Sequence, residues 1–362
     1  MAIWKIDELG EFVTLKRGYD LPQQKRKNGE IPIFSSSGVT GTHNEAMVEA
    51  PGVITGRYGT IGEVFLAETS FWPLNTTLYV ENFHENDEKF VYYFLKTLEW
   101  KKFASASAVP GINRNTVHKE IVRFPDFETQ QKIASVLSTI DKKIAVNKAI
   151  NDNLEQQAAA LFSSLYNRSN TEVRYTDLIQ ILGGGTPKTG ETAYWNGNIA
   201  FFTPKDVGTP YTFITEKTIT EEGLSHCNSR LYPVNTVFVT ARGTVGKVGL
   251  SGVPMAMNQS CYALVGKETH QLLVYFYTLK AVDRLKHKAS GAVFDAITTR
   301  DFDSEQIMKL SDDDAKAFLC VAEPMFQEML NNSIENLRLS TLRDFLLPKL
   351  MSGEIDVSSV QL

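Results

Sequence analysis

The chain has 362 residues, with 37 Lys and Arg against 42 Asp and Glu, and a formal net charge of −5. This length predicts two or three domains, and the charge argues against a general polyanion-binding protein, although local basic surfaces still allow DNA recognition. The sequence has no apolar run of transmembrane length and no signal peptide, and its three cysteines lack the spacing of a disulfide framework or zinc site. We therefore expect a cytoplasmic protein without a metal site of its own.

Short blocks of sequence recur about half a chain length apart. The paired blocks are Gly59-Thr60-Ile61-Gly62 with Gly243-Thr244-Val245-Gly246, Leu74-Asn75-Thr76 with Met257-Asn258-Gln259, and Ala108-Val109-Pro110 with Ala292-Val293-Phe294. Solenoid and propeller repeats have periods of only roughly 20–50 residues. The long period therefore predicts a duplicated domain, and the two diverged copies favour a ligand with two similar but different sites.

Residues 1–127 are rich in Gly, Ser, Thr and β-branched residues broken by turn signals, which predicts a first mixed α/β domain. One helix is expected over 88–103, where apolar residues recur at helical spacing. Gly59 and Gly62 are expected in a tight turn between strands, where glycine supplies a positive φ or allows close backbone approach.

Residues 128–170 predict one long amphipathic helix. Its apolar positions alternate in steps of four and three, with two asparagines in the middle of the seam. The principal seam positions are Ile133, Leu137, Ile140, Ile144, Asn147, Asn151 and Leu154. Such a helix would be roughly 57 Å long, so it needs a partner, and we expect the two asparagines to fix the register of the pair rather than to face solvent.

Residues 171–311 predict a second mixed α/β domain, with extra residues between Pro187 and Val237. Residues 312–362 predict a second long helix and a tail, the helix covering about 314–350 with Pro324 in its first turns or at a kink. Its seam residues include Met329, Ile334, Leu337 and Leu346. The fold class is therefore α+β, a pseudo-two-fold internal repeat of two domains separated by two long helices in an antiparallel coiled coil.

No catalytic or nucleotide-binding motif is found in the sequence. Pro125-Asp126 followed by Asp141-Lys142-Lys143 superficially fits a metal-dependent nuclease, but such an enzyme needs its carboxylates to converge on one ion. Asp141 instead falls inside the long helix, where a charge is expected to face solvent. A self-sufficient nuclease or methyltransferase is therefore the less favoured alternative.

Four segments carry a resemblance to a known family. They are Gly-Arg-Tyr-Gly-Thr-Ile-Gly (56–62), Ala-Arg-Gly-Thr-Val-Gly (241–246), Phe-Pro-x-Phe-Glu-x-Gln-Gln-Lys-Ile-Ala (124–134) and Leu-Arg-Asp-Phe-Leu-Leu-Pro-Lys-Leu-Met-Ser-Gly-Glu-Ile (342–355). With the order domain, helix, domain, helix, the whole chain resembles the specificity subunit of type I restriction-modification systems. It departs from the family pattern at 313–316, where Asp-Asp-Ala-Lys replaces a Pro-rich helix entry.

The resemblance implies a non-catalytic subunit in a complex that methylates adenine or cleaves unmodified DNA. Each domain would be a target recognition domain that reads one half of a bipartite, asymmetric site in double-stranded DNA. The helices would set the half-site spacing and dock two methyltransferase subunits, and motor-nuclease subunits would complete the complex. S-adenosylmethionine, ATP and Mg²⁺ would belong to those partners, and this chain would need no cofactor. A subunit of the same architecture in a fused restriction enzyme or phage-defence methylation system is the alternative.

The loops beside the glycine turns are the best candidates for DNA contact. Arg and Lys pair with guanine or phosphate, and hydroxyl groups with either base edges or phosphate. The candidate DNA-binding residues are Ser36, Ser37, His43, Arg57, Tyr58, Thr60, Lys188, Tyr194, Lys205, Arg242, Thr244 and Lys247.

Overall fold

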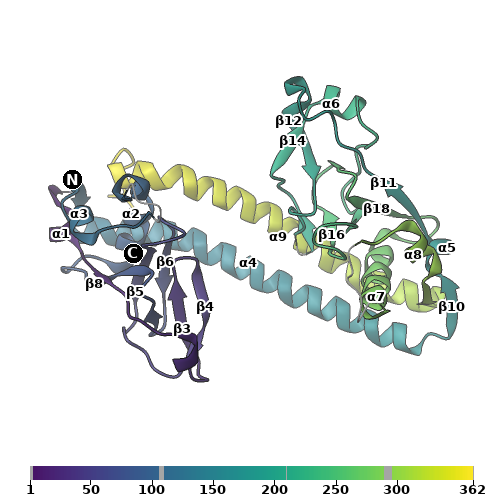
Figure 1. Cartoon of the computed structure of the whole chain (residues 1–362), viewed down its shortest axis with the longest axis horizontal. Helices are drawn as coiled ribbons and strands as arrows, with labels where there is room; N and C mark the ends of the chain where they lie inside the picture. Colours follow the sequence, from purple (N-terminus) through teal and green to yellow (C-terminus); the bar gives the residue numbers. More distant parts are fainter. Residues whose placement is uncertain (1–2, 106–109, 209, 289–295, 362) are drawn as a thin grey trace. The chain divides into compact units, whose positions relative to one another are not determined.

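The computed structural model describes residues 3–105, 110–208, 210–288 and 296–361. The third repeated block, at 108–110 and 292–294, therefore lies almost entirely outside the described residues. The chain forms two compact units, Met1–Ala145 with Asn336–Leu362, and Val146–Glu335. Each unit combines one α/β domain with part of each long helix, α4 and α9 (Figure 1).

The domain of the first unit contains two main sheets. The four-stranded sheet is antiparallel with order β2-β8-β5-β6, and the three-stranded sheet has order β4-β3-β7 with β3 and β7 parallel. Their bounds are β2 Thr14–Arg17, β3 Ile31–Ser35, β4 Gly38–His43, β5 Gly52–Gly56, β6 Val64–Ala67, β7 Trp72–Pro73 and β8 Thr77–Asn82. A separate pair, β1 (Trp4–Glu8) with β9 (Ile121–Pro125), leads into α4.

The domain of the second unit repeats this topology. Its larger sheet has order β11-β18-β15-β16-β13, and its three-stranded sheet has order β14-β12-β17 with β12 and β17 parallel. The bounds are β11 Ile179–Gly183, β12 Trp195–Phe202, β13 Tyr211–Thr212, β14 Lys217–Ile219, β15 Val237–Thr240, β16 Val248–Ser251, β17 Met255–Met257 and β18 Cys261–Gly266. The added strand β13 falls in the extra sequence between Pro187 and Val237. The predicted duplication is thus confirmed strand by strand.

Short helices complete the two domains. The first domain has α1 (Leu9–Phe12), α2 (Glu88–Lys96) and α3 (Arg114–His118), and the second has α5 (Tyr175–Leu178), α6 (Glu221–Ser225), α7 (Gln271–Lys288) and α8 (Thr299–Ser304). The helix predicted over 88–103 is wrong in its second half, because α2 ends at Lys96 and a 3₁₀ turn follows over Trp100–Phe103. There the Trp100 indole folds back and donates a hydrogen bond to the Leu95 carbonyl over 2.8 Å.

Helix α4 covers Phe127–Arg168 and α9 covers Asp312–Ser352. Asp126 caps α4, because its carboxylate accepts hydrogen bonds from the backbone and hydroxyl of Thr129. Helix α9 starts at Asp312, within two residues of the predicted start, and Pro324 lies inside it rather than in its first turns. Among the described residues, no helix is long and apolar enough to cross a membrane.

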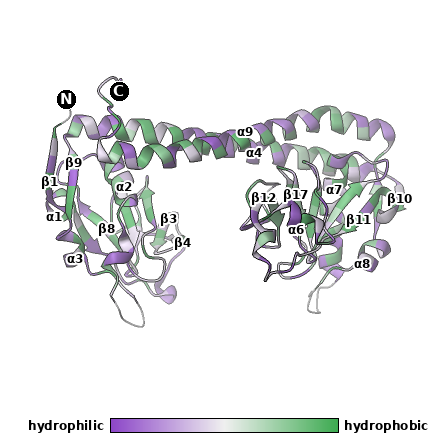
Figure 2. Ribbon diagram, turned by 90° about the horizontal axis from the view of Figure 1, so that it is seen from above, coloured by the Kyte–Doolittle hydropathy of each residue, from purple (hydrophilic) through white to green (hydrophobic). Residues whose placement is uncertain are grey.

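Within each unit the two helices run antiparallel, as predicted (Figure 2). In the second unit, Asn147 pairs with Glu335 and Arg168 pairs with Asp314, so partner numbers fall in α9 as they rise in α4. In the first unit, Ile133 and Leu137 of α4 share a core with Leu350 near the end of α9. Each domain core therefore continues into the helices.

Candidate DNA-binding surfaces

The glycine turn of the second domain lies at the edge of a cleft. Gly243 and Gly246 join β15 to β16 with φ angles of +82° and +73°, which favour glycine, as expected for this turn. The cleft is lined by Thr203, Pro204, Lys205, Glu216, Lys217, Arg242, Gly243, Thr244, Asn258 and Ser260. The structure thus brings three predicted DNA-binding residues together, Lys205, Arg242 and Thr244.

Side-chain hydrogen bonds fix the walls of this cleft. The Thr244 hydroxyl donates to the Pro204 carbonyl over 3.0 Å, which ties the glycine turn to the opposite wall. The Asp206 carboxylate accepts bonds from the Thr203 backbone at 2.8 Å and the Glu216 backbone at 2.7 Å. The Asp206 carboxylate therefore fixes the backbone of the cleft wall, and hydrogen bonds within the protein maintain the shape of the cleft.

The cleft offers cations and neutral polar groups side by side. Lys205, Lys217 and Arg242 are exposed cations, and only the first has an acidic partner in the lining, Glu216 at 3.4 Å. Asn258 and Ser260 add an amide and a hydroxyl, and the side-chain oxygen Oδ1 of Asn258 accepts the Ser260 backbone N–H over 3.0 Å. Cations suit phosphates, and amides and hydroxyls suit base edges.

Sequence reasoning missed Lys217, Asn258 and Ser260 as cleft residues. Asn258 belongs to a repeated block, so the repeat itself was a usable signal. Lys217 reaches the cleft only because β14 pairs with β12, which no local pattern indicates.

The remaining predicted residues of the second domain lie outside the cleft lining. Lys247 is exposed just after the glycine turn, and Lys188 is exposed in the extra sequence. Tyr194 is half-buried and its ring stacks on His226 with 4.9 Å between ring centres. The structure does not gather these three with the cleft residues.

The glycine turn of the first domain meets a hairpin. Gly59 and Gly62 have φ angles of +74° and +92°, and a Cβ added to Gly59 would lie 3.3 Å from the Ser36 hydroxyl. Ser36 and the exposed Ser37 form the turn between β3 and β4, so this hairpin and the exposed Thr60 share one surface.

Arg57 and Tyr58 are half-buried beside the same turn. The Arg57 Nε donates to the Ile112 carbonyl over 3.3 Å, and its guanidinium lies 4.6 Å from the centre of the Tyr58 ring. Both side chains therefore also stabilise the loop that carries them.

The prediction that His43 binds DNA does not agree with its position in the structure. Only 3% of its surface is exposed. Its Nδ1 accepts the Lys27 backbone N–H over 3.0 Å, and its ring packs edge-on against Trp72. A buried imidazole held in this way supports the fold and does not reach a ligand at the surface.

The two aspartates of the nuclease-like pattern have structural partners. Asp126 caps α4, and Asp141 accepts a hydrogen bond from the Tyr93 hydroxyl over 2.6 Å and pairs with Arg343. The expectation that Asp141 simply faces solvent is therefore wrong. Among the described residues, no group of three or more His, Cys, Asp or Glu side chains is arranged to hold a metal ion.

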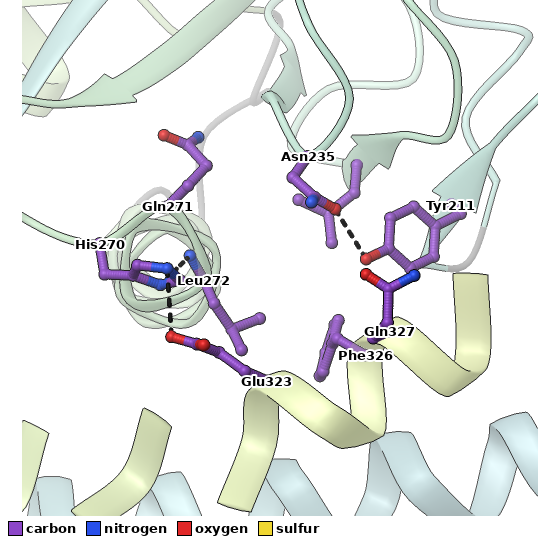
Figure 3. Close-up of a pocket in the computed structure, with 9 residues that line it drawn as sticks. Tyr211, Asn235, His270, Gln271, Leu272, Glu323, Phe326 and Gln327 are labelled. Atoms are coloured by element: carbon purple, nitrogen blue, oxygen red, sulfur yellow. Dashed lines mark hydrogen bonds and ion pairs between the residues drawn. The ribbon is translucent and has the colours of Figure 1, made fainter. Parts of the chain in front are cut away.

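A separate pocket in the second unit lies between its domain and α9 (Figure 3). His270 and Glu323 face each other there at 3.2 Å, and the Tyr211 hydroxyl donates to Asn235 over 2.8 Å. Burial raises the pKa of Tyr211, which keeps this hydroxyl protonated. The pocket contains none of the predicted DNA-binding residues.

Comparison with known proteins places both halves of the chain in one family. A family model described as the type I restriction modification DNA specificity domain matches residues 1–156 and 167–309. The HindI specificity subunit of Haemophilus influenzae is 25% identical over 345 residues, covering 72% of this chain and 75% of that protein. The EcoR124I/EcoR124II specificity subunit of Escherichia coli is 29% identical over 204 residues, covering 52% of this chain and 50% of that protein.

A solved structure shares the fold. The type I restriction-modification S subunit from M. genitalium superposes with a TM-score of 0.66 at 17% identity, covering 96% of each chain.

Proposed function

Since the chain belongs to the type I restriction-modification specificity family, whose members are non-catalytic DNA-recognition subunits, we propose that its two domains each read one half of a bipartite DNA site. We assign recognition to residues 1–127 and 171–311, joined by the spacer segments 128–170 and 312–362. The observation that carries this proposal is the duplicated topology, in which each copy places a glycine turn beside a polar surface. Because the copies differ in sequence, the half-sites should differ as well.

We propose the cleft of the second domain and the hairpin surface of the first as the DNA-contacting regions. The residues retained from the sequence prediction are Ser36, Ser37, Arg57, Tyr58, Thr60, Lys188, Tyr194, Lys205, Arg242, Thr244 and Lys247, with Lys217, Asn258 and Ser260 added. Cations at the cleft rim would hold phosphates, and Asn258 and Ser260 would contact bases. The net charge of −5 makes such local cations decisive for affinity.

The long helices would act as the spacer between half-sites. A helix of 42 residues such as α4 is about 63 Å long. This length is sufficient for half-sites on one face of DNA, which are separated by about one helical turn, roughly 34–36 Å. A spacer of this length and regularity supports one fixed gap whose base pairs are not read.

The same helices would dock two methyltransferase subunits. Exposed apolar side chains on α4 and α9 support this, because isolated helix surfaces are normally polar. They are Phe127, Val146, Ile150, Val321, Leu342 and Phe345. The methyltransferase subunits would bring S-adenosylmethionine for adenine methylation, and motor-nuclease subunits would use ATP and Mg²⁺ to cleave unmodified DNA. Such a complex would act in the cytoplasm, together with the DNA that it modifies.

Genome-wide methylation mapping with and without the gene for this chain tests the proposal. We expect the intact strain to carry one methylated motif of two unlike halves at a fixed gap, and its loss on deletion. An unchanged methylation pattern, or loss of a motif without a gap, would refute the bipartite reading.

A further inference from the structure

Three charged or polar side chains join the first domain to both long helices. The Tyr93 hydroxyl of α2 donates to Oδ2 of Asp141 in α4 over 2.6 Å. The other oxygen of Asp141, Oδ1, accepts from Nη1 of Arg343 in α9 over 2.8 Å. All three residues belong to the first unit. One carboxylate therefore connects three elements.

The environment of this cluster makes its geometry specific. Tyr93 is only 3% exposed, and burial, together with the bond to Asp141, raises its pKa, so its hydroxyl remains a donor. Arg343 is half-buried and its remaining nitrogens bind Asp344. Hydrogen bonds to charged partners are directional, whereas apolar contacts tolerate small shifts between the surfaces that they join.

The apolar contacts of the first domain with the helices do not by themselves define one orientation. Phe90 and Phe94 of α2 share a core with Ile133 and Leu137 of α4 and with Leu350 of α9. Burial of these side chains favours contact, but it is not directional. Gln130 near the start of α4 bonds to the Asn86 side chain and the Asp87 backbone, and the polar cluster adds a second directional connection that also reaches α9.

The second domain is attached to the helices by aromatic packing and by separate polar contacts. An aromatic cluster joins it to the helices, with Phe276 of α7 stacked on Phe162 of α4 at 5.0 Å and edge-on to Phe318 of α9 at 5.2 Å. Counting along the repeat, the α9 position that corresponds to Asp141 is Met325.

In the second domain the Tyr275 hydroxyl of α7 donates to Glu155 of α4 over 3.2 Å, and His270 faces Glu323 of α9 at 3.2 Å. Two separate carboxylates thus make these contacts in the second domain, whereas in the first domain the single carboxylate of Asp141 bonds to both α2 and α9.

We propose that Tyr93, Asp141 and Arg343 fix the orientation of the first recognition domain on the helix pair, and we call these three residues the latch. The latch would thereby set the number of base pairs between the half-site of this domain and the other half-site. The inference rests on the proposed function, because it concerns the gap between half-sites. These are positioning residues, and none of them lies among the proposed DNA contacts. Loss of the latch should leave both half-sites readable while relaxing the gap between them.

The test uses the complete methylation complex and DNA duplexes that carry the mapped half-sites with the native gap or with one or two base pairs added or removed. Tyr93→Phe keeps the ring and removes only the donor. For the native gap we expect the affinity to stay within about threefold of the wild-type value. The ratio of affinity for the native gap to affinity for an altered gap should fall roughly tenfold. This is the factor associated with losing one hydrogen bond to a charged group. Arg343→Gln tests the other side of the latch on a more exposed side chain and should act in the same direction.

Tyr92→Phe is the matched control, because Tyr92 is the neighbouring tyrosine and its hydroxyl only accepts a bond from Lys96. A general loss of stability would weaken binding to every duplex equally and would count against the latch. Unchanged gap discrimination in both latch variants would overturn the latch and leave the proposed function standing. A wild-type complex that binds all gaps equally would refute the proposed function and the latch with it.

Discussion

Asn147 donates a hydrogen bond to Glu335 across the helix pair, with 2.7 Å between Nδ2 and Oε2, from a side chain that is completely buried. One turn further along α4, Asn151 donates to the Ser333 hydroxyl and accepts from Asn332 over 3.0 Å. These residues form a polar layer between otherwise apolar helix faces. Their pairing is satisfied in one register only, because sliding either helix by a turn would bury these groups opposite apolar side chains.

Substituting Asn151 with Ala should destabilise the second unit by about 1–3 kcal/mol, because the buried amide of Asn332 loses its acceptor. Chemical denaturation of the intact chain measures this change. Asn153→Ala is the control, since Asn153 is exposed on the same helix and its loss should cost less than about 0.5 kcal/mol. Equal effects of the two substitutions would show that the polar layer contributes no specific stability.

The cap of α4 makes a second prediction. Asp126→Ala should destabilise the first unit by about 1 kcal/mol, because it removes an N-terminal cap, while Asp126→Asn should preserve most of the stability because Asn caps equally well. Thermal unfolding compares the two variants. If Asn were as destabilising as Ala, the capping account of Asp126 would be wrong.

The same residue links stability to pH. Partial burial opposes ionisation, but hydrogen bonds from Ile3 and Thr129 outweigh it and hold the pKa of Asp126 below its ordinary value. A lowered pKa in the folded state means that the carboxylate stabilises the fold fully above its ordinary pKa and loses this contribution as the pH falls through the folded pKa. Wild-type protein should therefore lose more stability on acidification below about pH 4 than Asp126→Asn does. Parallel curves for the two proteins would contradict this assignment.

Much of this architecture is readable in the sequence, and the exceptions have physical causes. The seam of α4 and the glycine turns follow from local periodicity and from the backbone freedom of glycine. The Tyr93–Asp141 bond does not, because it joins residues far apart in the chain and because heptad spacing assigns Asp141 to solvent. His43 differs for a similar reason, since a polar residue near turns is expected at the surface, whereas the fold leaves only 3% of it exposed and packs its ring against Trp72.

The cations of the second-domain cleft should contribute to DNA affinity through phosphates. Arg242→Ala and Lys217→Ala should each weaken DNA binding by the complex. If the side chain contacts a phosphate, its removal should also make the fall of log affinity with log salt concentration shallower by about one. Binding titrations at several salt concentrations measure both effects. Lys316→Ala, at an exposed position on α9, should change neither, and equal loss in this control would show a general charge effect instead of a cleft.

Docking of the methyltransferase subunits should depend on exposed apolar residues near the end of α9. Leu342 and Phe345 are 45% and 58% exposed, so replacing both with Ser should leave the fold intact and reduce recovery of the methyltransferase subunit in pull-down assays. Ile214→Ser removes a still more exposed apolar residue, 71% exposed, from a loop of the second domain and serves as the control. Undiminished recovery with the double variant would exclude this part of α9 from the docking surface.

The central claim is that each domain reads its own half of a split site. Methylation mapping of a strain in which residues 1–127 are exchanged for the first domain of another specificity subunit tests it most directly. We predict a new sequence in one half of the motif, with the other half and the gap unchanged. A change in both halves, or no change in either, would contradict independent reading by the two domains.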